Sequence, residues 1–520
     1  MARKQVSGDS RSLRAVLDNP AMPALIQSLP AQELSLLCAR IGPADALHIM
    51  ALAPVERLVQ ALEASVWKSP RPGVSEVFDT RELLEWIWAW LDIGEEFTAQ
   101  RLAAVPDGDL TLYLSNLATV TTAAMWGFER STEIGDLERI YAPSHDETAY
   151  GPYVVRARRQ EDWEILRAAL DAMWSHAPGR LLHLFAQLSG DESMLAPERD
   201  RESSNEDFVF ARDSDREGRG YVTANGARAF LALASSPLEE LAALSEYDLE
   251  TRRYLAGLGR SLGADPQHAQ EETTAVPAPD MSHLAALHIA LEEAGLLEPP
   301  PAQLLLGHEA TSRQLPIVKL LQALAGKDAA GFDARSQELA YLGGVLIAGI
   351  AVEGTALSPA QARSAALATC NLGLETLRSH AERLRIDREP GLVRLFLIGF
   401  SVLSTLPARV VQCFEQCFRA LREAPTEPLH EWLVEQAEVS VADLSDAVAK
   451  ADFNAAREAT MALCFVFEPR ACRAVMPLLD QLPRLGTGDG TEPTWIDSVA
   501  AIATAAELLH GIGAKRPGAP

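Results

Sequence analysis

The feature that most constrains this chain is an unbroken apolar segment in its second half. Residues 339–352 read Leu-Ala-Tyr-Leu-Gly-Gly-Val-Leu-Ile-Ala-Gly-Ile-Ala-Val and contain no charged side chain. A helix that is apolar on every side has no face for water, so it lies inside a large protein or a membrane. Spanning a bilayer takes about 20 such residues, and Glu353 ends the run before that length. The segment therefore predicts a buried central helix.

A second helix is predicted directly after it. Ser358 is an N-cap residue, Pro359 occupies the first helical position, and Gln361 can reach back to the cap. The following apolar residues recur at alternating spacings of three and four and so form one stripe: Leu367, Cys370, Leu374, Leu377, Ala381 and Leu384. The stripe needs an apolar partner, and the helix at 339–352 is the nearest in sequence. We therefore predict an antiparallel helical hairpin in which Gly343 and Gly373 let the two backbones approach closely.

The whole chain is expected to be all-α, a multi-helical array or bundle with at most one small β-hairpin. Its apolar residues are mostly Ala, Leu and Val, and only 6% of all residues are aromatic, which favours helices. A length of 520 residues exceeds what one hydrophobic core supports, so several domains are expected. The predicted boundaries are 13–135 for an N-terminal helical repeat domain, 136–262 for a middle domain with a long acidic loop, 263–280 for a linker, and 281–515 for a C-terminal domain.

The charge balance excludes some classes of partner. With 72 acidic and 46 basic residues the net charge is −26, which repels nucleic acid and anionic lipid. The N-terminus lacks the apolar core of a secretory signal, and no other segment reaches membrane length by inspection. We therefore expect a cytoplasmic protein without membrane insertion, in which the six cysteines are reduced.

The N-terminal region contains short units that begin with proline. The units around Pro30, Pro43 and Pro54 each place an acidic residue and apolar residues after the proline, 13 and 11 residues apart. Helices this short are stable only when they stack on neighbours, as in a helical repeat array. Residues 25–65 resemble the superhelical N-terminal domain of magnesium transporters and related segments of flagellar motor-switch proteins. The resemblance implies a stacking module and carries over no functional residue.

Two stretches with aromatic residues predict specific local structures. Trp86 and Trp90 lie four residues apart and share a helix face, whereas Trp88 points elsewhere. Packing in the core is the favoured interpretation, and an aromatic ligand platform is the alternative. Residues 150–158 combine aromatic and β-branched residues with turn signals, which predicts the one small hairpin.

No established catalytic or metal-binding motif appears in the sequence, and we predict no metal and no cofactor. Cys370 is the most plausible reactive residue, but it falls on the apolar stripe, which favours a packed core thiol over an activated one. Cys413 and Cys417 lie four residues apart on a helix, yet no histidine nearby completes a metal site. Core packing is the favoured interpretation for both.

Five residues near the helical hairpin are candidates for ligand binding. Asn371 and Glu375 follow one polar line beside the apolar stripe; a solvated or salt-bridged helix face is the favoured interpretation, and a buried binding edge is the alternative. Glu353 either caps a pocket or, as the favoured interpretation, marks the helix exit. The full candidate set is Tyr341, Glu353, Cys370, Asn371 and Glu375.

The hairpin residues also resemble a known group of proteins. The segments Glu-Leu-Ala-Tyr-Leu at 338–342 and Ala-Thr-Cys-Asn-Leu-Gly-Leu-Glu at 368–375, with the early Leu-Pro-x-x-Glu-Leu unit, are similar to an uncharacterised bacterial family of long helical proteins, over residues 20–515. A family without an assigned activity implies a fold and no catalytic residues.

The sequence leaves the function unknown, and whether the protein is an enzyme stays open. The favoured hypothesis is a cytoplasmic interaction or scaffold protein whose helical array binds a protein partner. The alternative is a small-molecule sensor or enzyme with a pocket beside the 339–384 hairpin. A third hypothesis is a structural subunit of a larger assembly. The sequence does not indicate an oligomeric state.

Overall fold

The chain forms a predominantly helical protein, as predicted. The computed structural model describes residues 22–29, 31–122, 147–189, 213, 216–217, 221–243, 251–252, 254–255, 315–380, 391–423, 428–486 and 493–512. The described residues divide into two compact units. Unit 1 includes residues 22–68 and 76–189, and unit 2 includes residues 69–75, 213–255 and 315–512, each with the gaps given above. The domain boundaries predicted near 135, 263 and 280 lie outside the described residues.

Unit 1 consists of short helices and a small sheet. Its elements are α2 (Met22–Ser28), α3 (Ala31–Ile41), α4 (Leu47–Leu52), α5 (Val55–Val66), β1 (Trp67–Lys68), β2 (Val77–Phe78), α6 (Thr80–Ile93), α7 (Glu95–Ala104), α8 (Asp107–Leu117), β3 (Ala118–Thr122), β4 (Glu147–Tyr150), β5 (Tyr153–Ala157), η1 (Gln160–Asp162), α11 (Trp163–His176) and α12 (Pro178–Leu188).

The first helices of unit 1 pack in the way that their lengths require. Helix α3 packs on α5, and α4 packs on α2 and α6, so each short helix buries its apolar residues against neighbours. Pro54 is the N-cap of α5, one residue before the first helical residue, Val55, whereas the prediction placed the proline at the first helical position itself. The expected stacking of short helices is therefore present in the described part of this region.

The predicted hairpin is present and belongs to a larger sheet. Strands β4 and β5 pair antiparallel with Tyr150 opposite Tyr153, and β3 pairs with the other edge of β5. Three further antiparallel ladders of two residues occur among the described residues: β1–β2, β6–β7 and β8–β9. The sequence did not predict β3 because its five residues directly follow α8 without a turn signal.

The tryptophans of α6 lie as predicted. Trp86 and Trp90 are buried, and their rings meet edge to face with centroids 6.1 Å apart. The Trp88 side chain is 44% exposed. The ring contact is part of the core of unit 1, which supports the packing interpretation.

Unit 2 is built from longer helices. Its elements are α15 (Ala224–Leu233), α16 (Leu238–Ala243), α20 (Pro316–Ala325), α21 (Ala329–Gly349), β6 (Ala351–Val352), β7 (Thr355–Ala356), α22 (Pro359–Ser379), α24 (Leu392–Leu403), α25 (Leu406–Arg422), α26 (Pro428–Ala449), α27 (Phe453–Leu463), α28 (Pro469–Val475), η2 (Met476–Leu479), β8 (Arg484–Leu485), β9 (Thr494–Trp495) and α29 (Val499–His510).

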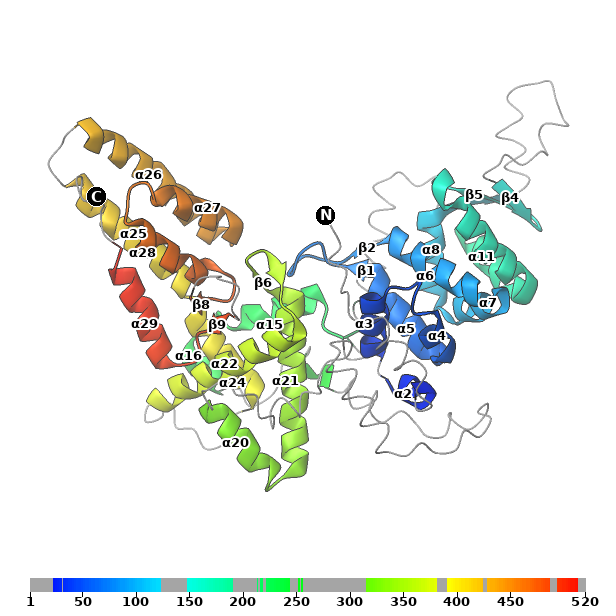
Figure 1. Ribbon diagram of the computed structural model, residues 1–520, viewed down its shortest axis with the longest axis horizontal. Helices are drawn as coiled ribbons and strands as arrows, with labels where there is room; N and C mark the ends of the chain where they lie inside the picture. Colours follow the sequence, from blue (N-terminus) through cyan, green and yellow to red (C-terminus); the bar gives the residue numbers. More distant parts are fainter. Residues whose placement is uncertain are drawn as a thin grey trace. The chain divides into compact units, whose positions relative to one another are not determined.

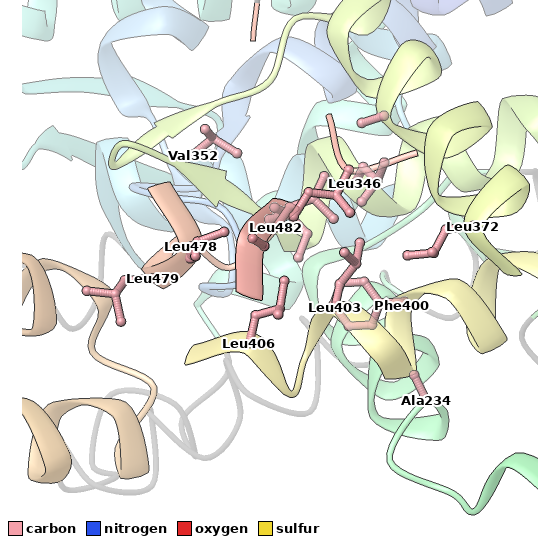
Figure 2. Packing of buried hydrophobic residues seen from close by; sticks show 14 of the residues in the cluster. Ala234, Leu346, Val352, Leu372, Phe400, Leu403, Leu406, Leu478, Leu479 and Leu482 are labelled. Atoms are coloured by element: carbon pink, nitrogen blue, oxygen red, sulfur yellow. The ribbon is translucent and has the colours of Figure 1, made fainter. Parts of the chain in front are cut away.

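The apolar run of 339–352 is at the centre of this unit. Figure 1 shows α22 and α24 beside α21, and α26 paired with α27. Leu339, Leu342, Val345 and Leu346 of α21 are each fully buried. Figure 2 shows Leu346 in one cluster with Leu403 and Leu482, which come from other parts of the unit. Helix α21 packs on α22, so the predicted hairpin is present, with the capping box of Ser358 and Gln361 at the start of α22.

The close approach through Gly373 involves a different partner from the one predicted. A Cβ atom at Gly373 would lie 1.9 Å from the carbonyl oxygen of Leu395, and one at Gly399 would lie 2.0 Å from that of Thr369. The two glycines therefore form the crossing point of α22 and α24. At Gly343 a Cβ atom would meet only the Arg363 side chain at 3.4 Å, an ordinary contact. The predicted partner was wrong because α24 lies beyond the predicted hairpin, and spacing along one sequence does not indicate which helix crosses α22 at Gly373.

One apolar stretch in unit 2 has the length of a membrane span. Residues 392–422 contain a sufficiently apolar window, which sequence inspection had missed, and 61% of that window is buried inside the fold. The stretch comprises α24 and α25, which are separated by a turn at Ser404 and Thr405. Core helices of soluble proteins meet the same length and composition criteria, so the stretch is weak evidence of insertion.

Candidate functional site

Unit 2 contains a cavity of about 400 Å³ at the C-terminal end of α21. Small-molecule sites in proteins begin near this size. Five short segments of the unit form the wall. The lining residues are Arg71, Pro72, Gly73, Val74, Arg228, Gly349, Ala351, Gly354, Lys450, Ala451, Asp452, Phe453, Asn454, Asp480 and Gln481.

The turn between β6 and β7 forms one side of this cavity. Val352 pairs with Thr355, which leaves Glu353 and Gly354 as a two-residue loop. Their φ angles are +53° and +76°, so both residues lie in the left-handed region that a type I′ turn requires. Glycine adopts this conformation freely, whereas glutamate pays about 1–2 kcal/mol. The interactions of the Glu353 side chain must offset this cost.

The Glu353 carboxylate belongs to a network of four charges, one of which, Asp480, lines the cavity. It pairs with Arg484, and it lies 3.7 Å from the Arg457 guanidinium. Asp480 binds the same two arginines, at 3.1 Å from Arg484 Nε and 3.7 Å from Arg457. Asp480 and Arg484 are almost completely buried, with side-chain exposures of 3% and 6%. Burial raises the pKa of Asp480, and the two arginines oppose that rise.

The network also holds the backbone of the turn. Asp480 Oδ1 accepts from the backbone amide of Glu353 at 3.4 Å, and Gln481 Oε1 accepts from that of Ala351 at 2.7 Å. Glu353 is therefore fixed through both its backbone and its side chain. The prediction named Glu353 either as a pocket cap or as a helix exit, and it lies in the turn that borders the cavity.

A left-handed residue, Ala451, also lines the cavity. Ala451 has φ +53° and follows the end of α26. Asp452 N donates to Ala447 O, and Ala451 N donates to Val448 O, which is the hydrogen-bond pattern of a Schellman C-cap. Glycine is usual at that position, so the alanine stores backbone strain. The Asp452 side chain then caps α27 by accepting from Ala455 N, so the first turn of α27 borders the cavity.

Three basic side chains line the cavity. Arg71, Arg228 and Lys450 are exposed and come from three separate segments. Lys450 pairs with Asp446 at 2.7 Å, and Arg228 donates to the amide oxygen of Asn225.

Two of the predicted candidates, Asn371 and Glu375, connect helices. Asn371 Oδ1 accepts from the Ile317 amide at 3.0 Å, in the first turn of α20, and its Nδ2 donates to Asp497 O at 2.8 Å. Glu375 Oε2 accepts from the Val499 amide at 2.9 Å, at the start of α29. The polar line along α22 therefore satisfies amides at two helix N-termini.

Cys370 and Tyr341 lie in the core, away from the cavity lining. Cys370 is fully buried, and its thiol donates to Leu392 O at 3.4 Å. Burial raises the pKa of this thiol well above its ordinary value, which disfavours the nucleophilic thiolate. The Tyr341 hydroxyl lies 3.2 Å from Thr251 Oγ1, and its ring packs on Phe230 and Tyr254. These surroundings match the packing interpretation of Cys370.

The described residues contain no group of three or more His, Cys, Asp or Glu side chains placed to hold a metal ion. Cys413 and Cys417 direct their thiols at backbone carbonyls, those of Leu509 at 3.0 Å and Ile512 at 3.1 Å. A further cavity, in unit 1, measures about 20 Å³ and is lined by apolar residues such as Leu83 and Leu170. That volume holds no metabolite.

The N-terminal part of the chain matches one family model. Residues 5–194 are similar to a family of unknown function (DUF6178). The match agrees with the predicted likeness to an uncharacterised family over that part of the chain. The similarity to magnesium transporters is not shown, and the segments at 338–342 and 368–375 lie outside the match. Comparisons with curated proteins and with solved structures found no match.

The sequence patterns did not predict most of the residues that line the cavity. Glu353 was the only candidate beside it, because the end of an apolar run is visible in one sequence. Arg71, Arg228 and Asp480 lie in segments that no periodic pattern connects. Two sequence signals could have indicated the cavity wall. One is the Glu-Gly pair after the apolar run, which is a variant of the Asn-Gly hairpin turn. The other is the Lys-Ala-Asp sequence at 450–452, which lies between two helices.

Proposed function

We propose that this protein binds a small molecule in the cavity at the end of α21 and acts as a sensor of that molecule. The observation that carries the proposal is the construction of the wall. Of the two non-glycine residues with left-handed φ in the described chain, Ala451 lines this cavity, and Glu353 lies in the turn whose next residue, Gly354, lines it. Such residues cluster at ligand-binding sites, where the surrounding structure holds them in place.

The charge network supports the same proposal. Burying Asp480 and Arg484 side by side costs solvation energy that an apolar pair would not cost. The network fixes the Glu353 turn and one edge of the cavity. A preorganised wall lowers the entropic cost of binding, so this arrangement suits ligand recognition.

A screen of the full-length protein by thermal unfolding tests the proposal. A metabolite present at 100 times its Kd is expected to stabilise unit 2 by about 2.7 kcal/mol. Asn454→Trp places a large ring in the cavity wall at an exposed position and is expected to abolish the stabilisation. Glu458→Trp, one turn further along α27 and outside the lining, is the matched control and is expected to keep it. Equal stabilisation of both variants, or no stabilising compound in a broad screen, contradicts the proposal.

Recognition of a protein partner is a second candidate function, favoured by the outer face of α26. Trp432 and Val439 are 51% and 56% exposed, and their spacing of seven places them on one helix face. Ala437 and Leu444 lie on the opposite face of α26 and are buried. Exposed tryptophan is enriched at the centres of protein interfaces.

Affinity capture with the full chain tests this second function. The double variant that combines Trp432→Ser with Val439→Ser is expected not to capture at least one protein that the wild-type chain captures and keeps during washing. Val77→Ser, which removes a 60% exposed valine from unit 1, is the control and is expected to retain that protein. An identical set of captured proteins for all three chains counts against recognition through α26.

A further inference from the structure

We infer that the ligand of the cavity at the end of α21 carries a phosphoryl group. This inference rests on the function proposed above and names the class of ligand. The lining contains three basic side chains, Arg71, Arg228 and Lys450, against two acidic ones, Asp452 and Asp480. The chain as a whole has a net charge of −26, so a cavity wall with more basic than acidic side chains has the opposite sign of charge from the rest of the chain.

The two acidic residues of the lining are already neutralised by the protein. Asp480 is paired with Arg457 and Arg484, and it also accepts from the Glu353 amide. Asp452 accepts from the Ala455 amide as the cap of α27, where the helix dipole favours a negative charge. Neither carboxylate therefore needs a cation from the ligand.

The basic residues retain more capacity for an anion. The Arg71 guanidinium has no hydrogen bond or ion pair with any residue that the structure describes, and Arg228 donates to the neutral amide of Asn225. Only Lys450 is paired with a carboxylate, and that pair with Asp446 is exposed. An arginine side chain binds phosphate oxygens with two parallel N–H groups, which gives both energy and orientation.

The number of cations favours phosphate over carboxylate. A terminal phosphoryl group carries up to two negative charges on three oxygens, which suits a lining with basic side chains from three segments. Phe453 and Asn454 in the first turn of α27 also line the cavity, so the positive end of that helix dipole lies at the wall.

The experiment measures binding of pyrophosphate to the full-length protein by calorimetry at two salt concentrations. Saturable binding that weakens as salt rises is expected, because exposed charges are screened. Arg71→Gln and Arg228→Gln are each expected to weaken binding by about tenfold or more, since each removes a charged hydrogen bond. Arg419→Gln, at an exposed position of α25 outside the lining, is the matched control and is expected to leave the affinity unchanged.

The outcomes separate the ligand class from the proposed function. Citrate that binds as tightly as pyrophosphate overturns the phosphoryl assignment, as does pyrophosphate binding that survives both glutamine substitutions. If neutral compounds from the thermal screen bind and lose their effect in Asn454→Trp while pyrophosphate does not bind, the inference fails and the proposed function stands. If no compound of any charge binds, both fail.

Discussion

Replacing Arg484 with methionine is expected to lower the free energy of unfolding of unit 2 by about 3–5 kcal/mol. The substitution keeps much of the side-chain volume but leaves the Asp480 carboxylate, 3% exposed, without its closest cation at 3.1 Å. It also releases Glu353, whose left-handed backbone depends on its carboxylate contacts. The measurement is urea unfolding of the full chain, with the transition of unit 2 followed separately because two units need not unfold together.

The pH dependence of this variant gives an independent check. Burial raises the pKa of Asp480 above its unfolded value, and losing Arg484 raises that pKa further. A raised carboxyl pKa means that the folded state is favoured below the unfolded pKa and loses stability as the pH rises through the folded pKa. The difference in unfolding free energy between the wild type and Arg484→Met is therefore expected to become smaller as the pH falls towards 4.

The control for this prediction is an exposed ion pair. Arg419 lies 3.7 Å from Glu415 on α25 with 71% of its side chain exposed, and Arg419→Met is expected to cost less than about 0.5 kcal/mol. A similar cost for the two substitutions, or a deficit at Arg484 that does not change with pH, would mean that the buried network is not the source of the stability.

Replacing Gly399 with alanine is expected to destabilise unit 2 by at least about 3 kcal/mol. The added methyl group would lie 2.0 Å from the carbonyl oxygen of Thr369, which is a backbone atom in the middle of α22 and cannot rotate away. Gly373→Ala meets the Leu395 carbonyl oxygen at 1.9 Å and is expected to behave in the same way. Either change separates α22 from α24, two helices that form much of the core of unit 2.

Gly343→Ala provides the matched control on the neighbouring helix. Its new methyl group meets only the Arg363 side chain, at an ordinary contact distance of 3.4 Å, so it is expected to be neutral or to stabilise by up to about 1 kcal/mol through the higher helix propensity of alanine. Thermal unfolding of the three variants tests the ranking. The prediction fails if Gly399→Ala unfolds at the wild-type temperature or if Gly343→Ala is destabilised equally.

Local signals predicted the helices well because their causes lie within a few residues. The capping box at Ser358 and Gln361, the shared face of Trp86 and Trp90, and the hairpin near Tyr150 each depend on contacts between close neighbours in the chain. The burial of α21 followed from the absence of any polar face. These features required no knowledge of the tertiary fold.

The site depends on contacts between distant segments, which one sequence does not reveal. Asn371 binds an amide 54 residues away, and Glu375 binds one 124 residues away, so their polar line looked like a possible ligand edge. Glu353 acquires its role from Arg484, 131 residues later. The chemistry of each residue was visible in the sequence, but the partner that decides its role was not.

The short segment Ser69–Ser75 limits how this protein can be divided. It interrupts the sequence of unit 1, yet it is grouped with unit 2, where the Gly73 amide donates to Ala348 O at 2.8 Å. No single cut in the polypeptide separates the two units. A recombinant fragment ending near residue 194, where the family match ends, would carry Arg71 without the other walls of the cavity. Studies of excised fragments would therefore miss the ligand recognition that we propose for the intact chain.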